Sequence, residues 1–501
     1  MPSDKASSPA QEGGERNSGQ PRNGMSPAPG RPKTRLLTRL LDVRPNEIAM
    51  LGWAWLYVLS VMSAYYVIRP IRDTMGIEGG VENLQWLFTG TLLVMLAINP
   101  AYAALVRTLP RQKFIAFAYL FFIANLAVFA WLMQVATGRD LVWVGRAFFI
   151  WVSVFNLFVV SVFWALMVDV FDTEQAKRLF GFLAAGATIG AILGSSLTAS
   201  LAAGIGNTWL LLASATLLLV AILCVRRLAR LTAALRLAPG EAAATKDAAE
   251  QPIGGGLLSG ITHTLRSPYL LGISLYILLY AITSTFLYFE QAAIVRDYFP
   301  DRTARTTFFA GVDLVVNILT LLVQLFVTGR FLRAFGVGVT AAVLPFCTLV
   351  GFGVLAAAPT LAVLVLVQVL RRVGNFGLAR PTREVLFTVV SREDKYKAKS
   401  MIDTVVYRAG DQAGSWSYAL LGMAGLGSAG VALAALPVSA IWLVNALWLG
   451  RRQKAMAASG DAHAAGSAAV VAGPALATPA PAARSAAAQA GAPAMPPGGA
   501  K

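Results

Sequence analysis

Long apolar runs alternate with short polar breaks along most of this chain. Between Ile48 and Gly450, stretches of about twenty predominantly apolar residues recur, and the breaks between them carry polar residues, glycine or proline. One such run is long enough to cross the hydrocarbon core of a bilayer as a helix. The pattern predicts an all-α polytopic membrane protein with twelve transmembrane helices. The predicted spans lie near residues 48–69, 85–107, 114–136, 141–168, 179–203, 208–228, 269–290, 306–329, 336–357, 359–379, 400–425 and 428–450.

Composition supports a membrane protein rather than a soluble one. Hydrophobic residues make up 56% of the chain and charged residues 13%, whereas a soluble domain carries about a quarter charged residues. Mean hydropathy is +0.63. The formal net charge is +17, but the basic residues lie in the tails and in alternate loops, which is the pattern of cytoplasmic membrane loops. We therefore predict that the basic residues lie beside a lipid bilayer and do not bind nucleic acid.

The polar segments divide the chain into five parts. Residues 1–46 are rich in Pro, Gly, Ser and Arg and predict a disordered N-terminal tail, and residues 455–501 predict a disordered Ala/Pro-rich C-terminal tail. Between them we expect a six-helix half at 47–228, a linker at 229–267 and a second six-helix half at 268–454. Loop charge favours a bacterial inner membrane location with both termini cytoplasmic.

Two short matches suggest that the halves are repeats. Gln-Ala-Lys at 175–177 is matched by Lys-Ala-Lys at 397–399, each just before a helix, at an offset of about 222 residues. Arg107 and Arg330, which follow the second helix of each half, are about 223 residues apart. One offset relating equivalent loops is what a duplicated six-helix unit predicts. We therefore expect two six-helix pseudo-repeats in a major-facilitator-like architecture.

Charged residues at membrane depth are the candidates for chemistry, because an ionised side chain there costs at least about 2.5–3.5 kcal/mol and should face a wet cavity or another charge. Any one of them could equally form a gating ion pair at the mouth of the cavity. The excess of Arg over Lys favours an anionic solute, since Arg binds phosphate or carboxylate bidentately. The substrate-binding or gating candidates are Arg72, Arg146, Asp169, Glu290, Asp313, Arg383, Arg408 and Asp411, and Arg371 and Arg372 also lie at membrane depth.

Other chemistry is not indicated. The chain has no GxxxxGK[ST], GxSxG or HExxH motif, so the sequence predicts no enzyme. Cys224 and Cys347 lie apart in apolar segments, and His263 and His463 have no ligand-like neighbours. We therefore predict no metal and no cofactor.

Three stretches resemble the nucleotide-transporter (ATP/ADP antiporter) family, a branch of the major facilitator architecture. Arg72-Asp73-Thr74-Met75 is similar to its Lys-Asp-Thr-Leu. Phe163-Trp164 through Asp169, with Glu174 to Phe180, is similar to its Phe-Trp…Glu and Glu-Ala-Lys-Arg-Phe. The third stretch is similar to its Asp-Pro-Thr-Lys-Glu…Lys-x-Lys-x-Lys…Asp…Arg-x-Gly and consists of Arg380-Pro381-Thr382-Arg383-Glu384, Lys395, Lys397, Lys399, Ile402-Asp403 and Arg408-Ala409-Gly410.

The resemblance implies that Arg72, Asp169, Glu290 and residues of the eleventh helix form the site. Asp411 departs from the family pattern, in which this position is Lys. The expected function is secondary transport, by alternating access, of a small anionic solute such as a nucleotide. Two alternatives are a proton-coupled exporter of another metabolite or drug, with Asp313 and Asp411 as its cation or proton sites, and a non-transporting membrane sensor or scaffold.

Overall fold

The structure is a computed structural model that describes residues 44, 47–108, 111–236, 264–265, 267–390, 398–399 and 401–471. Most of the predicted N-terminal tail, most of the linker, Lys395, Lys397 and the C-terminal residues 472–501 lie outside the described residues. The described part is helical and contains no strand. The all-α fold predicted from the apolar runs is confirmed.

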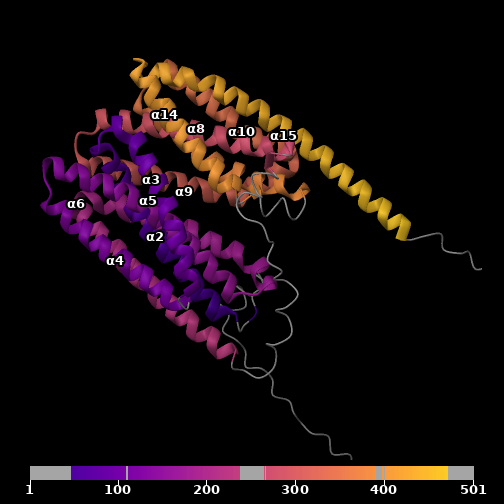
Figure 1. The fold of residues 1–501 in the computed structure, drawn as a ribbon, viewed down its shortest axis with the longest axis horizontal. Helices are drawn as coiled ribbons and strands as arrows, with labels where there is room; N and C mark the ends of the chain where they lie inside the picture. Colours follow the sequence, from indigo (N-terminus) through magenta and orange to yellow (C-terminus); the bar gives the residue numbers. More distant parts are fainter. Residues whose placement is uncertain are drawn as a thin grey trace, which may run out of the picture.

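Each half is a bundle of long helices (Figure 1). The N-terminal half contains α2 (Ile48–Glu78), η1 (Val81–Asn83), α3 (Leu84–Thr108), α4 (Arg111–Val135), α5 (Gly138–Val170) and α6 (Thr173–Arg236). The C-terminal half contains α8 (Pro268–Tyr298), α9 (Arg302–Phe326), α10 (Thr328–Ala357), α11 (Leu361–Gly374), η2 (Asn375–Ala379), α12 (Arg380–Leu386), η3 (Phe387–Val389), η4 (Ile402–Val406), α14 (Tyr407–Met423) and α15 (Ser428–Val471).

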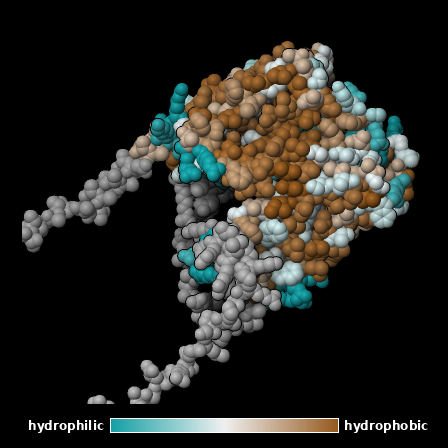
Figure 2. All heavy atoms as spheres, turned by 180° about the vertical axis from the view of Figure 1, so that it is seen from behind, coloured by the Kyte–Doolittle hydropathy of each residue, from teal (hydrophilic) through white to brown (hydrophobic). Residues whose placement is uncertain are grey.

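The number of membrane crossings is consistent with twelve. Ten helices of the described residues are long and apolar enough to cross a membrane. One of them, α6, covers two predicted spans. The chain turns between these spans at Gly206, whose φ of 74° is unfavourable for residues other than glycine. The predicted span 400–425 corresponds to η4 followed by α14, which has 17 residues. Figure 2 shows the broad apolar surface that these helices expose between polar residues at the ends.

Two helices extend past the predicted boundaries of the halves. Helix α6 continues to Arg236, and α15 continues to Val471, beyond residue 454. Both extensions are rich in Ala, which has the highest helix propensity, so a helix is favoured there without an apolar face. Hydrophobic periodicity therefore predicts where the membrane span ends, whereas the helix itself ends later.

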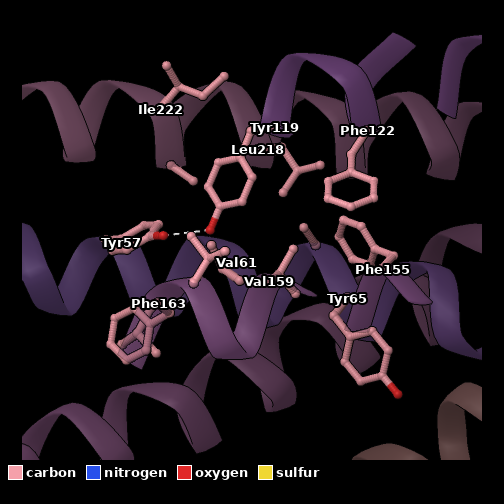
Figure 3. Packing of buried hydrophobic residues seen from close by; sticks show 14 of the residues in the cluster. Tyr57, Val61, Tyr65, Tyr119, Phe122, Phe155, Val159, Phe163, Leu218 and Ile222 are labelled. Carbon is pink, nitrogen blue, oxygen red and sulfur yellow. Dashed lines mark hydrogen bonds between the residues drawn. The ribbon is translucent and has the colours of Figure 1, made fainter. Parts of the chain in front are cut away.

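The two halves have separate apolar cores and share a further cluster at one end. Figure 3 shows the N-terminal core, where Tyr57 and Tyr119 form a hydrogen bond of 2.5 Å among aromatic and branched side chains. We call the end of the molecule that holds Glu47 and Pro268 the tail side and the opposite end, with Glu78, the far side. A further cluster of buried side chains at the far side includes both Leu84 and Phe309 and so joins the two halves.

A glycine stripe brings α6 against α2. Gly186, Gly190 and Gly194 follow one another at intervals of four residues, and a Cβ at Gly190 would lie 2.6 Å from the carbonyl oxygen of Leu59 on α2. The Ser63 hydroxyl donates a hydrogen bond of 2.9 Å to the Gly190 carbonyl across the same contact. The stripe therefore packs helices, as small residues do in membranes.

The C-terminal half repeats this contact. A Cβ at Gly410 of α14 would lie 2.6 Å from the Ala281 Cβ of α8, and one at Gly414 would lie 3.0 Å from the Ile282 Cα. Thus α14 packs on α8 in the C-terminal half as the first part of α6 packs on α2 in the N-terminal half. This equivalence of contacts is what two related six-helix halves predict.

We expect Gly190→Ala to destabilise the protein, because its methyl group would overlap backbone that cannot rotate away. Overpacking of this kind costs about 1–3 kcal/mol. The measurement is the thermal unfolding midpoint of the purified protein in detergent. Gly181→Ala is the matched control, since a Cβ at this exposed position of α6 meets nothing within 4 Å. Equal midpoints for the two variants would contradict the close contact between α2 and α6.

Candidate functional site

A central cavity of about 210 Å³ lies between the two halves. Both halves contribute side chains, and three of the predicted site residues are among them. The lining residues are Arg72, Phe88, Thr91, Phe149 and Ser153 from the N-terminal half and Ser284, Thr285, Tyr288, Tyr407, Arg408, Asp411 and Gln412 from the C-terminal half. The arrangement places arginines of the first and eleventh helices in one enclosure.

Arg72 enters the cavity from the end of α2. Its Nη2 lies 2.7 Å from Oδ1 of the neighbouring Asp73, and its guanidinium carbon lies 4.8 Å from the centre of the Phe149 ring. Asp73 also accepts a hydrogen bond of 3.0 Å from the Tyr288 hydroxyl of the other half. Arg72 is therefore an arginine held in place by its own neighbour and by aromatic side chains.

Arg408 and Asp411 lie one turn apart on α14. Arg408 Nη1 is 3.2 Å from Asp411 Oδ2, and the Arg408 side chain is one-third exposed whereas that of Asp411 is 10% exposed. The helix carrying them begins directly after the π-helical turn η4, and such turns occur frequently at functional sites. Asp411 thus neutralises Arg408 within the cavity.

Arg371, a charged residue at membrane depth outside the predicted site set, lies beside the central cavity. It lies on α11, is only 4% exposed, and its Nη2 donates a hydrogen bond of 2.8 Å to the Ser284 hydroxyl in the cavity wall. No carboxylate pairs with it among the described residues. The sequence places Arg371 in an apolar run, which indicates a charge at membrane depth, but the adjacent Arg372 lies in the same run. Only the fold shows which of the two arginines contacts the cavity wall.

Asp313 forms an ion-pair triad that joins the halves. Its Oδ1 lies 3.1 Å from Arg69 Nη1 on α2 and 2.6 Å from Arg372 Nη2 on α11. The Asp313 side chain is 3% exposed. Helices α2, α9 and α11 are therefore tied together on the tail side of Arg72.

The other four predicted residues lie outside the lining of the central cavity. Arg146 donates to the Gly79 carbonyl at the end of α2, at 2.9 Å from Nη2. Glu290 is fully buried and accepts a hydrogen bond of 3.0 Å from the Tyr418 hydroxyl. Asp169 is exposed near the end of α5, and Arg383 lies 3.4 Å from Asp403. The structure thus brings together Arg72, Arg408 and Asp411 but not the whole predicted set.

Several polar contacts join the halves at the far side. Arg305 Nη1 of α9 lies 3.1 Å from Glu78 Oε1 of α2, and the hydroxyls of Thr74 and Thr306 are 3.0 Å apart. The Trp416 indole N–H donates to the Thr89 hydroxyl at 3.2 Å. Together with the far-side apolar cluster, these contacts join the two halves at that end.

The tail side has a second cavity, the vestibule, of about 530 Å³. It lies between the halves, since Tyr66 of α2 and Ala187 of α6 line it together with Asn317 of α9 and Arg380. Arg380 lies over the Phe376 ring, at 4.8 Å from its centre. The vestibule therefore separates parts of the two halves at the tail side, and a cavity of about 480 Å³ lined by Glu78, Asn207 and Arg302 does so at the far side.

Ion pairs at the tail side stay within one half in the described part of the chain. Arg178 of α6 pairs with Glu47 at 2.9 Å, and Lys399 pairs with Glu384. Burial raises the pKa of Glu47, but hydrogen bonds from Arg178, the Arg44 backbone N–H and Gln175 outweigh it, so the pKa lies below its ordinary value. The carboxylate is thus ionised at neutral pH and anchors α2 to α6 without crossing the vestibule.

A family model described as "TLC ATP/ADP transporter" matches residues 142–453, more than half of the chain. The chain belongs to the TLC ATP/ADP transporter family. It is 23% identical to ADP,ATP carrier protein 1 of Chlamydia trachomatis, in an alignment that covers 89% of this chain and 96% of the relative. It is 24% identical to ADP,ATP carrier protein 1 of Chlamydia muridarum, with 85% and 93% covered. The resemblance seen in three short stretches is confirmed.

Solved structures show which fold this family member has. An auto-inhibited POT family peptide transporter matches with a TM-score of 0.54 at 14% identity, over 80% of this chain and 96% of that one. A bacterial homologue of the iron transporter ferroportin, in an inward-facing state, matches with a TM-score of 0.55 at 12% identity, over 80% and 99%. The fold is of the major facilitator type, as predicted. This TLC family member is a multi-pass membrane carrier that transports a small molecule.

Proposed function

We propose that this carrier exchanges adenine nucleotides such as ATP and ADP by alternating access between its two halves. The observation that carries the proposal is the convergence of Arg72 and Arg408, from opposite halves, on one central cavity. A solute held by both arginines would contact both rocking bodies at once, which is how a midplane site couples binding to motion. The family and the names of its chlamydial relatives support the nucleotide as the solute.

The roles we propose follow from what each side chain contacts. Arg72 and Arg408 bind phosphate oxygens, because a guanidinium offers two parallel donors to such a group. Asp411 competes with the solute for Arg408, and the buried carboxylate of Glu290 holds or releases a proton. Arg383 and Asp169 act at the vestibule and the end of α5 rather than on the bound solute.

We infer the direction of opening from the ion pairs between the halves. Arg305 pairs with Glu78 across the far side, whereas ion pairs at the tail side stay within one half in the described part of the chain, and we propose that both termini, and therefore the tail side, are cytoplasmic in a bacterial inner membrane. In that orientation, we infer that this conformation is inward-open. A transition to the outward-open state would separate Arg305 from Glu78 and close the halves across the vestibule.

The experiment is exchange by the full-length protein in proteoliposomes. Vesicles are loaded with ADP, and uptake of labelled ATP is measured against a panel of unlabelled nucleotides, phosphorylated metabolites, organic anions and organic cations. Saturable ATP uptake that requires internal ADP supports the proposal. Absence of ATP uptake, together with saturable uptake of a labelled solute of another class that neither ATP nor ADP inhibits, would assign the carrier to that class and reject the nucleotide.

Asp411→Asn tests the proposed competition for Arg408. Because Asn has the same shape and no charge, we expect Arg408 to become available and the KM for ATP to fall about tenfold, the effect of about 1–2 kcal/mol of removed repulsion at a distance of several ångströms. The measurement is the concentration dependence of ATP uptake. Asp297→Asn, at an exposed position where Asp297 pairs with Arg296, should leave the KM unchanged. A KM that stays the same or rises in Asp411→Asn would contradict the competition.

A further inference from the structure

We propose that Arg371 and Ser284 form a phosphate-binding relay in the wall of the central cavity. In this relay, the buried guanidinium of Arg371 holds the Ser284 hydroxyl so that its proton is offered to a phosphate oxygen of the solute. Ser284 would contact the solute, and Arg371 is a positioning residue that acts through it. The inference rests on the proposed function, because the phosphate is that of the transported nucleotide.

The first observation is the state of Arg371. Its side chain is almost completely buried, and its Nε and Nη1 atoms have no hydrogen-bond partner among the described residues. The centre of the Tyr280 ring lies 5.6 Å from its guanidinium carbon and offsets only part of the charge. A buried cation without a carboxylate is costly, so this position requires a reason beyond packing.

The neighbouring arginine shows that the fold does provide carboxylates at this depth. Arg372, next along α11, pairs with Asp313 at 2.6 Å, whereas Arg371 turns toward Ser284. The π-helical turn η2 begins at Asn375, directly after α11, and such turns are frequent at functional sites. Thus, just before this π-helical turn, Arg372 has a carboxylate partner and the adjacent Arg371 has none among the described residues.

The second observation is the geometry of Ser284. Ser284 lines the central cavity, and its Oγ accepts the hydrogen bond from Arg371 Nη2. A serine hydroxyl has one proton to donate and two lone pairs to accept with. Because a cation occupies the acceptor side, the proton remains available for an acceptor in the cavity, and a donor polarised by a cation favours an anion.

The relay also supplies a positive charge that no carboxylate offsets among the described residues. Arg72 pairs with Asp73 and Arg408 with Asp411, so each of these cations is offset by a carboxylate in the cavity or beside it. Arg371 contributes a positive charge with no such offset. An anionic group entering the cavity would therefore gain most at the side where Ser284 lies.

The test uses the full-length protein in proteoliposomes with the variants Ser284→Ala, Arg371→Gln and their combination. We expect each single variant to raise the KM for ATP about tenfold, which is the loss of one hydrogen bond to a charged group. The double variant should be no worse than the single variants, because all three remove the same contact. Ser284→Thr, which keeps the hydroxyl, should stay within about twofold of the native KM.

Ser274→Ala is the matched control on the same helix, since the Ser274 hydroxyl donates to its own Leu270 carbonyl and should not affect the KM. Single variants with a native KM, or a double variant whose effects multiply, would overturn the relay. Thermal midpoints in detergent identify variants that do not fold. If Arg371→Gln does not fold, the comparison of Ser284→Ala with Ser284→Thr decides.

A direct binding measurement separates this inference from the nucleotide proposal. Inorganic pyrophosphate is titrated into the purified native protein and into Ser284→Ala, and the heat of binding is recorded. Weaker pyrophosphate binding by Ser284→Ala supports the relay even if ATP is not transported. A native protein that transports ATP but binds pyrophosphate no better than Ser284→Ala would overturn the relay and leave the proposed function standing.

Discussion

Replacing Arg408 by alanine is expected to abolish nucleotide exchange, with the rate at low ATP concentration falling by at least about a hundredfold. Removing one side of a buried, hydrogen-bonded charge pair costs about 2–5 kcal/mol in binding. Two effects combine here, since the variant loses a guanidinium for phosphate and leaves Asp411 as an unpaired negative charge in the same cavity. The measurement is the initial rate of labelled ATP uptake into ADP-loaded proteoliposomes.

Two controls make this result specific. Arg330→Ala removes an exposed arginine of α10 that donates to the Phe326 carbonyl at the end of α9, and we expect native rates. In the combined variant Arg408→Ala with Asp411→Ala, part of the loss should be recovered, because the unpaired carboxylate is removed as well. Native exchange by Arg408→Ala would reject the central cavity as the nucleotide site.

Apolar patterning predicted the fold because the bilayer imposes it locally. A span needs about twenty apolar residues whatever its neighbours are, so each run could be recognised alone. The division into halves was predicted from two loops in each half that carry similar charges at one offset. Where α6 joins two predicted spans through Gly206, the runs of apolar residues were correct and only the continuity of the helix was not foreseen.

The site was predicted less completely because its chemistry depends on partners from other helices. Charge at membrane depth selected Arg72, Arg408 and Asp411, which line one cavity. The same criterion selected Arg146, which instead binds the Gly79 carbonyl. A sequence shows that a charge must be compensated, but whether by a carboxylate, a carbonyl or a solute is decided by tertiary structure.

Adjacent residues show this limit most clearly. Arg371 and Arg372 have the same charge and the same apolar surroundings in the sequence, yet one joins Asp313 and the other joins Ser284. They lie about 100° apart around α11 because a helix has 3.6 residues per turn. Which side faces α9 and which faces α8 follows from packing of the half as a whole.

Neutralising Asp313 is expected to cause the largest loss of stability. In Asp313→Asn, Arg69 and Arg372 become two guanidiniums without a carboxylate, with 19% and 10% of their side chains exposed. Breaking a buried ion pair by removing one partner costs about 3–5 kcal/mol. The measurement is the thermal unfolding midpoint in detergent, together with the fraction of protein that remains monodisperse.

The control for charge removal is Glu82→Gln, because Glu82 forms an exposed pair with Arg296 at 3.8 Å and such pairs contribute about 1 kcal/mol or less. A triple replacement, Arg69→Met, Asp313→Leu and Arg372→Met, should recover most of the stability lost in Asp313→Asn, since apolar side chains of similar size often replace a buried ion triad without cost. Recovery would show that unpaired charge, and not lost packing, destabilises the single variant. An Asp313→Asn protein as stable as the native one would mean that the triad does not tie the halves together.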